Sequence, residues 1–105
     1  MAAEVIQMKF LVTSTPRRLQ IPPISLIEAA KAWANARLAD KTIDCGYGFT
    51  TGGGFTIINA DSADTVAELL MEYPAYMFAD WKVDPLCDLN QSPDRSIALI
   101  RRITG

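Results

Sequence analysis

The sequence predicts one domain of the α+β class, with four strands, two helices between them and a further helix at the end. Three observations predict it. Segments with an apolar residue at every second position, the strand period, alternate with segments in which apolar residues recur every three or four positions, the helix period. A run of three glycines joins two of the strand-like segments. The length of 105 residues suits a single domain with one hydrophobic core.

The first predicted strand covers residues 5–13, because alternate positions are apolar and most positions between them are polar. Its apolar face carries Ile6, Met8, Phe10 and Val12. Residues 14–18 and the prolines at 22–23 predict a loop. A helix then begins at Ser25, which forms an S-x-x-E capping box with Glu28. Its expected buried stripe consists of Ile27, Ala30, Ala34 and Leu38, with Trp33 beside it.

The middle of the chain predicts a β-hairpin. Residues 42–51 alternate, so one face of this strand is expected to carry Ile43, Cys45, Tyr47 and Phe49. The opposite face is expected to carry Asp44, Gly46, Gly48 and Thr50. The glycines at 52–54 form the turn, since glycine adopts a positive φ without strain, and residues 55–60 form the return strand.

The second half of the chain predicts a helix, a strand and a last helix. Asp61 or Ser62 caps the first of these helices, and Pro74 ends it. Its buried stripe is Val66, Leu69, Leu70 and Tyr73. Residues 79–87 alternate and predict the fourth strand, with one face made by Trp81 and Val83 and the other by Asp80, Lys82 and Asp84. The last helix is expected to begin at Ser92 and to be anchored by Ile97, Ile100 and Ile103.

The element order is therefore β-α-β-β-α-β-α, and the first six elements match the ferredoxin-like βαββαβ arrangement. This arrangement places two helices on one face of a four-stranded antiparallel sheet and leaves the other face open. We expect the open face to contact a second copy, because apolar residues occur on both faces of the strands and half of all residues are hydrophobic. Two such sheets packed face to face form a dimeric α+β barrel with a small-molecule cavity in each subunit.

The composition argues against several functional classes. The chain has no histidine, which excludes Ser-His and Cys-His nucleophile systems and every His-ligated metal. Two cysteines do not make a four-cysteine zinc site, so we expect no metal site. The net charge is −2 without a basic stripe, so we expect no nucleic acid partner. No apolar run reaches about 18 residues and the start lacks a signal-peptide pattern, so we expect a cytoplasmic protein without a membrane segment.

A helix that ends at a proline leads into a strand of distinctive sequence. The helix ends at Pro74, and the strand reads Asp80-x-x-Val83-x-Pro85-Leu86. This spacing resembles the muconolactone isomerase family, over about a third of the chain. The resemblance implies a dimeric α+β barrel that isomerises a small unsaturated lactone by proton transfer, without metal or cofactor. Two features depart from the family: the first helix is mostly alanine, and the hairpin has glycines where the family has bulky side chains.

Three residues are candidates for proton transfer. Asp80 is the first, because a carboxylate that faces a partly dry cavity is desolvated and becomes a stronger base. The alternative is an exposed Asp80 in an ion pair beside Lys82. Asp44 shares its expected face with two glycines, which leave room above the sheet either for a ligand or for a closely packed helix. Tyr47 is expected either to orient a substrate oxygen or to lie in the core with its hydroxyl at the rim.

The expected ligand pocket combines the two glycines of the hairpin strand with an apolar cluster after the second helix. Its residues are Gly46, Gly48, Tyr76, Phe78 and Trp81. The alternative role of the cluster is a dimer contact.

Two function classes are open: a cofactor-independent isomerase or cyclase acting on a small apolar oxygenated molecule, and a non-catalytic ligand-binding or assembly protein on the same fold. A carboxylate inside the cavity favours the enzyme, a cavity without a titratable group favours binding, and a filled interior favours assembly.

Overall fold

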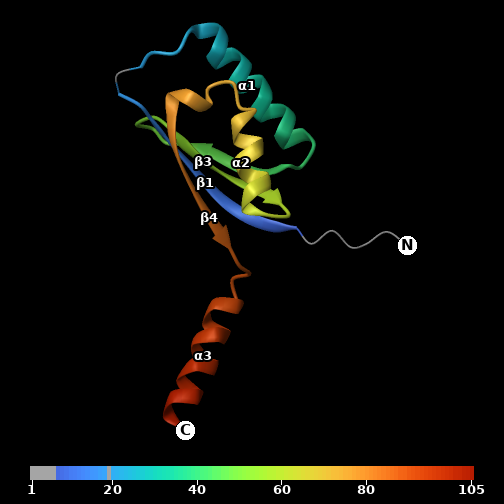
Figure 1. The fold of residues 1–105 in the computed structure, drawn as a ribbon, viewed down its shortest axis with the longest axis vertical. Helices are drawn as coiled ribbons and strands as arrows, with labels where there is room; N and C mark the ends of the chain where they lie inside the picture. The colour runs from blue at the N-terminus through green and yellow to red at the C-terminus, as the bar shows by residue number, and fades with distance from the viewer. Residues whose placement is uncertain (1–6, 19) are drawn as a thin grey trace, which may run out of the picture.

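Two helices cover one face of a four-stranded antiparallel sheet, and a third helix extends away from this body (Figure 1). The computed structural model describes residues 7–18 and 20–105, so Ile6, expected in the first strand, lies outside the described residues. The elements are β1 (Met8–Pro16), α1 (Ile24–Ala39), β2 (Ile43–Gly48), β3 (Gly54–Ala60), α2 (Ala63–Met71), a 3-10 turn (Tyr76–Phe78), β4 (Ala79–Leu86) and α3 (Gln91–Thr104). The strand order is β2-β3-β1-β4. The predicted α+β class and the ferredoxin-like βαββαβ order with an extra C-terminal helix are confirmed.

Strand β1 lies inside the sheet and ends three residues later than expected. It pairs with β3 on one side, as in Phe10 with Ile58, and with β4 on the other. The prediction of a loop from residue 14 was wrong, because Ser14, Thr15 and Pro16 continue the pairing with β4 as far as Ala79. A proline is tolerated here because it is the last residue of the strand.

The three helices begin close to their expected residues, and one of the three predicted caps is correct. Ser62 caps α2, and its hydroxyl accepts a hydrogen bond from the Thr65 N–H at 3.2 Å. The capping box at Ser25 was wrong: α1 begins at Ile24 after Pro23, without a side-chain cap. The extended Pro23 supplies its backbone carbonyl to the first turn instead. Helix α3 begins at Gln91 and has Asn90 as its cap residue, so Ser92 lies inside the first turn.

The hydrophobic core lies between the sheet and the two covering helices. It consists of Phe10, Val12, Ile43, Ile58, Ala60, Val66 and Leu70, each at most 5% exposed. Helix α1 contributes less than its predicted stripe, since Ala30 is its one buried residue whereas Ile27 and Leu38 are 47% and 39% exposed. Trp33 packs partly buried against the core. The side chains of α1 that face the sheet are therefore mostly either small or only partly buried.

A β-bulge in β2 reverses the faces predicted for most of this strand. The register shifts between Ile43 and Cys45, so that Ile43 pairs with Ile58 on the helix-covered face while Cys45 pairs with Ile57 on the open face. A bulge places two residues opposite one, so every residue after it changes side relative to a regular strand. Gly46 and Gly48 therefore share the covered face with Ile43, and Tyr47 is on the open face with Cys45.

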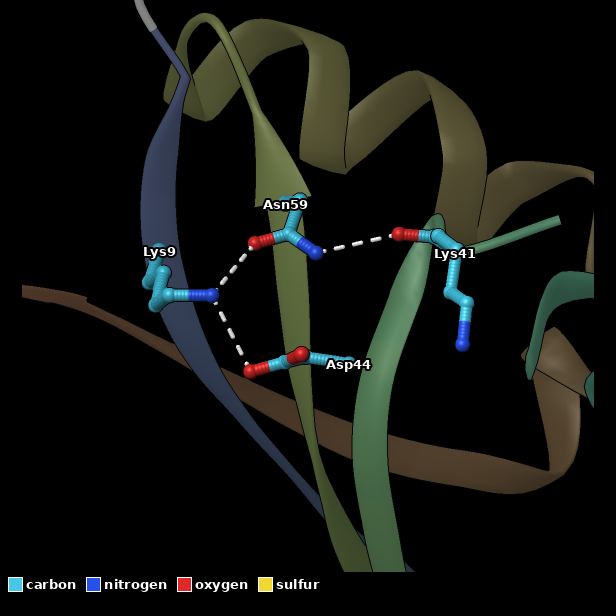
Figure 2. A network of polar contacts seen from close by, with 4 residues as sticks. All are labelled: Lys9, Lys41, Asp44 and Asn59. Carbon is cyan, nitrogen blue, oxygen red and sulfur yellow. Dashed lines mark hydrogen bonds and ion pairs between the residues drawn. The ribbon is translucent and has the colours of Figure 1, made fainter.

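The bulge also places Asp44 on the open face, away from the glycines with which it was grouped. Lys9 of β1 donates hydrogen bonds to the Asp44 carboxylate at 3.0 Å and to the side-chain oxygen of Asn59 at 2.9 Å (Figure 2). Asn59 in turn donates to the backbone carbonyl of Lys41 at 3.0 Å. Lys41 has φ of 71°, a left-handed conformation that a non-glycine residue rarely adopts. This network connects three strands to the turn between α1 and β2.

The prediction that Ile97, Ile100 and Ile103 anchor α3 was wrong. Their side chains are 47%, 58% and 74% exposed, and α3 has no buried residue. Beyond β4 the helix continues away from the sheet and from the other two helices (Figure 1). Among the described residues, no helix combines the length and the apolar character that crossing a membrane requires.

Candidate functional site

A cavity of about 450 Å³ lies between α1 and the covered face of the sheet. Its floor comes from the strands and is formed by Val12, Ser14, Ile43, Gly46, Gly48, Gly54, Thr56 and Ile58. Its roof is formed by three residues of α1, Trp33, Ala34 and Leu38. One end is closed by Leu70 of α2, by Tyr73, which follows α2, and by Trp81 of β4. The deepest residues are members of the core, whereas Gly48 is exposed. The cavity thus runs from the core to the hairpin end of the sheet.

The space exists because small residues face each other across it. Ala34 is on the helix side, and Gly46 and Gly48 are on the strand side. A side chain at Gly46 would approach the Thr56 methyl at 2.9 Å, so glycine is required there by packing. At Gly48 the nearest atom to an added Cβ is the Gly53 carbonyl oxygen at 3.8 Å. Packing therefore does not require glycine at position 48, and its missing side chain leaves space at the cavity floor.

Aromatic side chains form one end of the cavity. The rings of Trp33 and Tyr73 meet edge to face at a centroid distance of 5.3 Å, and those of Tyr73 and Trp81 do so at 5.4 Å. Trp81 is held from behind, because its indole N–H donates to the Tyr76 carbonyl at 3.0 Å and its ring stacks on that of Tyr76. Contacts within the chain therefore hold the Trp81 ring in position at this end of the cavity. Both tryptophans of the chain border the cavity.

The polar groups around the cavity are hydroxyls rather than charges. Ser14, Thr56 and Tyr73 belong to the lining, and none of the lining residues is Asp, Glu, Lys or Arg. Burial raises the pKa of the Tyr73 phenol above its ordinary value of 10.0, so this group stays neutral at physiological pH. The Ser14 hydroxyl donates to the Gly54 carbonyl at 3.4 Å. The site can therefore offer hydrogen bonds to a ligand but no fixed charge.

The structure brings together some of the predicted pocket residues. Gly46, Gly48 and Trp81 line the cavity. Tyr76 lies behind Trp81 as its support and is outside the lining. Phe78 is half-buried at the end of the 3-10 turn and does not line the cavity. Tyr47 borders it, but its ring lies toward the open face, 5.8 Å from that of Phe55.

Both aspartate candidates lie on the opposite face of the sheet from this cavity. Asp80 pairs with Thr15 in the register and accepts a hydrogen bond from the Arg17 guanidinium at 3.0 Å. Its side chain is 70% exposed, so this chain does not desolvate it. The ion pair considered as its alternative role is present, although with Arg17, while Lys82 lies 3.7 Å from Asp84. Asp44 is half-exposed and is paired with Lys9.

Several lining residues were absent from the predicted site. Trp33, Leu70 and Tyr73 were assigned to helix stripes, and Ser14 was assigned to a loop. The sequence feature that could have indicated the cavity is the combination of an alanine-rich helix, α1, with a glycine-containing strand, β2. Small residues on both sides of the interface between them reduce the side-chain volume there. That signal left open whether the helix closes onto the strand, and the structure shows that a cavity remains between them.

No protein-family model matches the sequence, and no curated protein is significantly similar to it. These comparisons identify no family. What the structure confirms of the resemblance to the muconolactone isomerase family is therefore the α+β fold, with four antiparallel strands and three α-helices in the described residues.

Proposed function

We propose that the protein binds a small, neutral, largely apolar molecule carrying one or two oxygen atoms in the cavity beneath α1. The observation that carries the proposal is the chemistry of the walls: apolar and aromatic side chains with a few hydroxyls and no charged group. Ligand sites are typically of this kind, mainly apolar with a small number of placed polar groups, and span about 300–1,000 Å³. The volume of about 450 Å³ falls in that range.

The shape of the aromatic end favours a flat ring. The rings of Trp33, Tyr73 and Trp81 meet edge to face. A planar aromatic ligand can pack against them in edge-to-face or offset-stacked contacts. The hydroxyls of Ser14, Thr56 and Tyr73 supply the directional contacts that orient a carbonyl, ether or hydroxyl oxygen. A charged ligand is disfavoured, because a charge in this environment would lack a partner.

Binding without catalysis is better supported than lactone isomerisation. Proton abstraction beside a carbonyl needs a base within hydrogen-bond reach of the substrate. The carboxylates of Asp44 and Asp80 are on the other face of the sheet and are ion-paired there. Of the lining residues, Tyr73 has a raised pKa that makes its phenol a poor base at neutral pH. The isomerase remains a prediction that a direct assay with an unsaturated lactone tests.

We also propose that the open face of the sheet mediates self-association. Its centre is apolar and incompletely covered, with a shallow groove of about 300 Å³ lined by Leu11, Thr13, Phe49 and Phe55. Charges around it are already paired within the chain, in Lys9–Asp44, Arg17–Asp80 and Lys82–Asp84. An apolar centre with a polar rim is the usual anatomy of a protein interface, and paired rim charges cost less to cover.

Two measurements test ligand binding. Native mass spectrometry of freshly purified protein should show a retained small molecule. Titration with a neutral fluorescent ligand, N-phenyl-1-naphthylamine, should quench the tryptophan emission, because Trp33 and Trp81 both border the cavity. Binding should be unaffected by pH between about 5 and 9, since the lining contains no Asp, Glu, Lys, Arg or Cys and burial raises the pKa of Tyr73.

Three results would contradict the binding proposal. One is tryptophan emission that does not respond to any neutral aromatic ligand. Another is a clear preference for charged ligands over neutral ones of the same size. The third is turnover of an unsaturated lactone that is lost on substitution of Asp44 or Asp80, which would restore the isomerase class.

A further inference from the structure

Helix α3 presents an apolar stripe that the described part of the chain leaves uncovered. At 100° per residue, Ile97, Leu99, Ile100 and Ile103 fall on one side of the helix, and all four are about half or more exposed. Arg95, Arg101 and Arg102 fall outside the stripe. A helix with this pattern is stabilised mainly by packing its apolar face, because a 14-residue helix is marginal in water by itself.

The segment between β4 and α3 directs the helix away from its own sheet. The Asp88 side chain accepts a hydrogen bond from the Asn90 N–H at 3.2 Å, and the Asp88 carbonyl accepts one from the Gln91 N–H at 3.0 Å. These bonds form a turn that sets the direction of the first helical residues. Figure 1 shows the consequence, with α3 continuing beyond the end of β4 rather than folding back over the strands.

We infer that α3 docks in the open-face groove of a second copy, so that two chains exchange their C-terminal helices. This inference rests on the proposed self-association and names the element that the partner contributes. The groove of about 300 Å³ is lined by Leu11, Thr13, Phe49 and Phe55, and isoleucine side chains are apolar and of a size to enter it. Helix α3 is about 21 Å long and β1 about 30 Å, so the helix can lie along the strands.

Charge and area agree with this assignment. Helix α3 carries three arginines and one aspartate, whereas the rest of the chain carries seven basic and eleven acidic residues. Asp44, Asp80 and Asp84 at the rim of the open face are 42–70% exposed, so each can accept a further hydrogen bond from the arginines that flank the stripe while it keeps its partner within the chain. Half the side of a cylinder about 10 Å wide and 21 Å long is about 330 Å². Two exchanged helices and the two surfaces they cover then bury about 1,300 Å², within the range of stable interfaces.

The test compares substitutions in the helix and in the groove by sedimentation velocity over a range of concentrations. Ile100→Asp places a carboxylate in the stripe, and Thr13→Arg places a cation in the groove against the arginines of α3. Each should raise the dimer dissociation constant on the order of a hundredfold, because the contact occurs twice in a symmetric dimer. The matched controls are Ala98→Asp, outside the stripe, and Thr15→Arg, on the same strand face but outside the groove. Both should associate like the original chain.

Mixing the two defective variants identifies the exchanged contact. Ile100→Asp retains an intact groove and Thr13→Arg an intact helix, so the mixture should form a heterodimer through one sound contact, tighter than either variant forms alone. An unchanged dimer in Ile100→Asp, together with loss of association in Thr13→Arg, would overturn the role of α3 and leave self-association through the open face standing. A monomer at every concentration would overturn both. Loss of the dimer in Ile100→Asp but not in Thr13→Arg would show that the helices pair with each other, and would overturn docking in the groove.

Discussion

Replacement of Gly48 by leucine should weaken ligand binding while leaving the fold at least as stable. Gly48 ends β2 on the covered face, and an added Cβ lies 3.8 Å from its nearest neighbour, so the first carbon of the new side chain meets no obstacle. The four added carbons occupy about 120 Å³, if each takes roughly the 30 Å³ of one water molecule in the liquid. That is about a quarter of the cavity of about 450 Å³. A ligand that loses contact with four methylene equivalents loses about 3 kcal/mol, on the order of a hundredfold in affinity.

The effects on stability and on binding have opposite signs, which makes the experiment decisive. Glycine in a strand is unfavourable by about 0.5–1 kcal/mol relative to alanine, so Gly48→Leu should not lower the free energy of unfolding. Urea denaturation measures stability, and quenching of tryptophan emission by N-phenyl-1-naphthylamine measures binding. Thr50→Leu, in the turn outside the cavity lining, is the control and should bind normally. Equal affinity in Gly48→Leu and the original chain would refute the assignment of the cavity as the binding site.

Three further predictions concern stability. Ile58→Ala should cost about 2–5 kcal/mol in urea denaturation because Ile58 is 1% exposed, and a smaller loss than in Ile57→Ala on the open face would contradict the assigned core. Lys41→Gly should raise the free energy of unfolding by about 0.5 kcal/mol, because glycine adopts the left-handed conformation of this position without strain. The substitution keeps the backbone carbonyl that accepts the hydrogen bond from Asn59. A decrease in the free energy of unfolding would instead show that the Lys41 side chain stabilises the turn. Burial raises the pKa of Tyr73 in the folded chain, so above pH 10 the unfolded chain releases this proton first. The free energy of unfolding should therefore decrease as the pH rises toward the higher pKa of the folded state. Tyr73→Phe should show a smaller decrease over the same pH interval.

The sequence was sufficient for the order of the elements because each local signal agreed with the final topology. Alternation identified β1 and β4, the glycine run identified the hairpin, and Ser62 identified the start of α2. Gly52 and Gly53 have φ of 107° and 74°, which is the conformation that the glycine run predicted. The pairing of β1 beyond residue 13 was not visible, because Ser14 to Pro16 have loop-like composition and form a strand only through contacts with β4.

The site was harder to predict because one inserted residue decides which side chains share a face. The bulge at Asp44 changes the side of every later residue of β2, and no local pattern in residues 42–51 distinguishes a bulged strand from a regular one. Gly46 and Gly48 do line the cavity, but Asp44 was placed with them by an unbroken alternation. Asp80 lies on the strand face predicted for it, together with Lys82 and Asp84. The cavity, however, lies on the opposite, helix-covered face of the sheet, so Asp80 does not reach it.

The high apolar content of this short chain is divided between its interior and several exposed surfaces. Part of it forms the core, and some core residues also line the cavity; other apolar side chains are exposed on the open face, on α3 and around the two covering helices. The cavity and the open face are on opposite sides of one sheet, so Gly48→Leu and Ile100→Asp act on different surfaces and should have additive effects. If the retained ligand instead bound more tightly to the dimer, the two surfaces would be coupled through the strands they share, and dimerisation would report ligand occupancy. Titrating the neutral ligand against Ile100→Asp therefore distinguishes an assembly that only stabilises the fold from one that responds to its ligand.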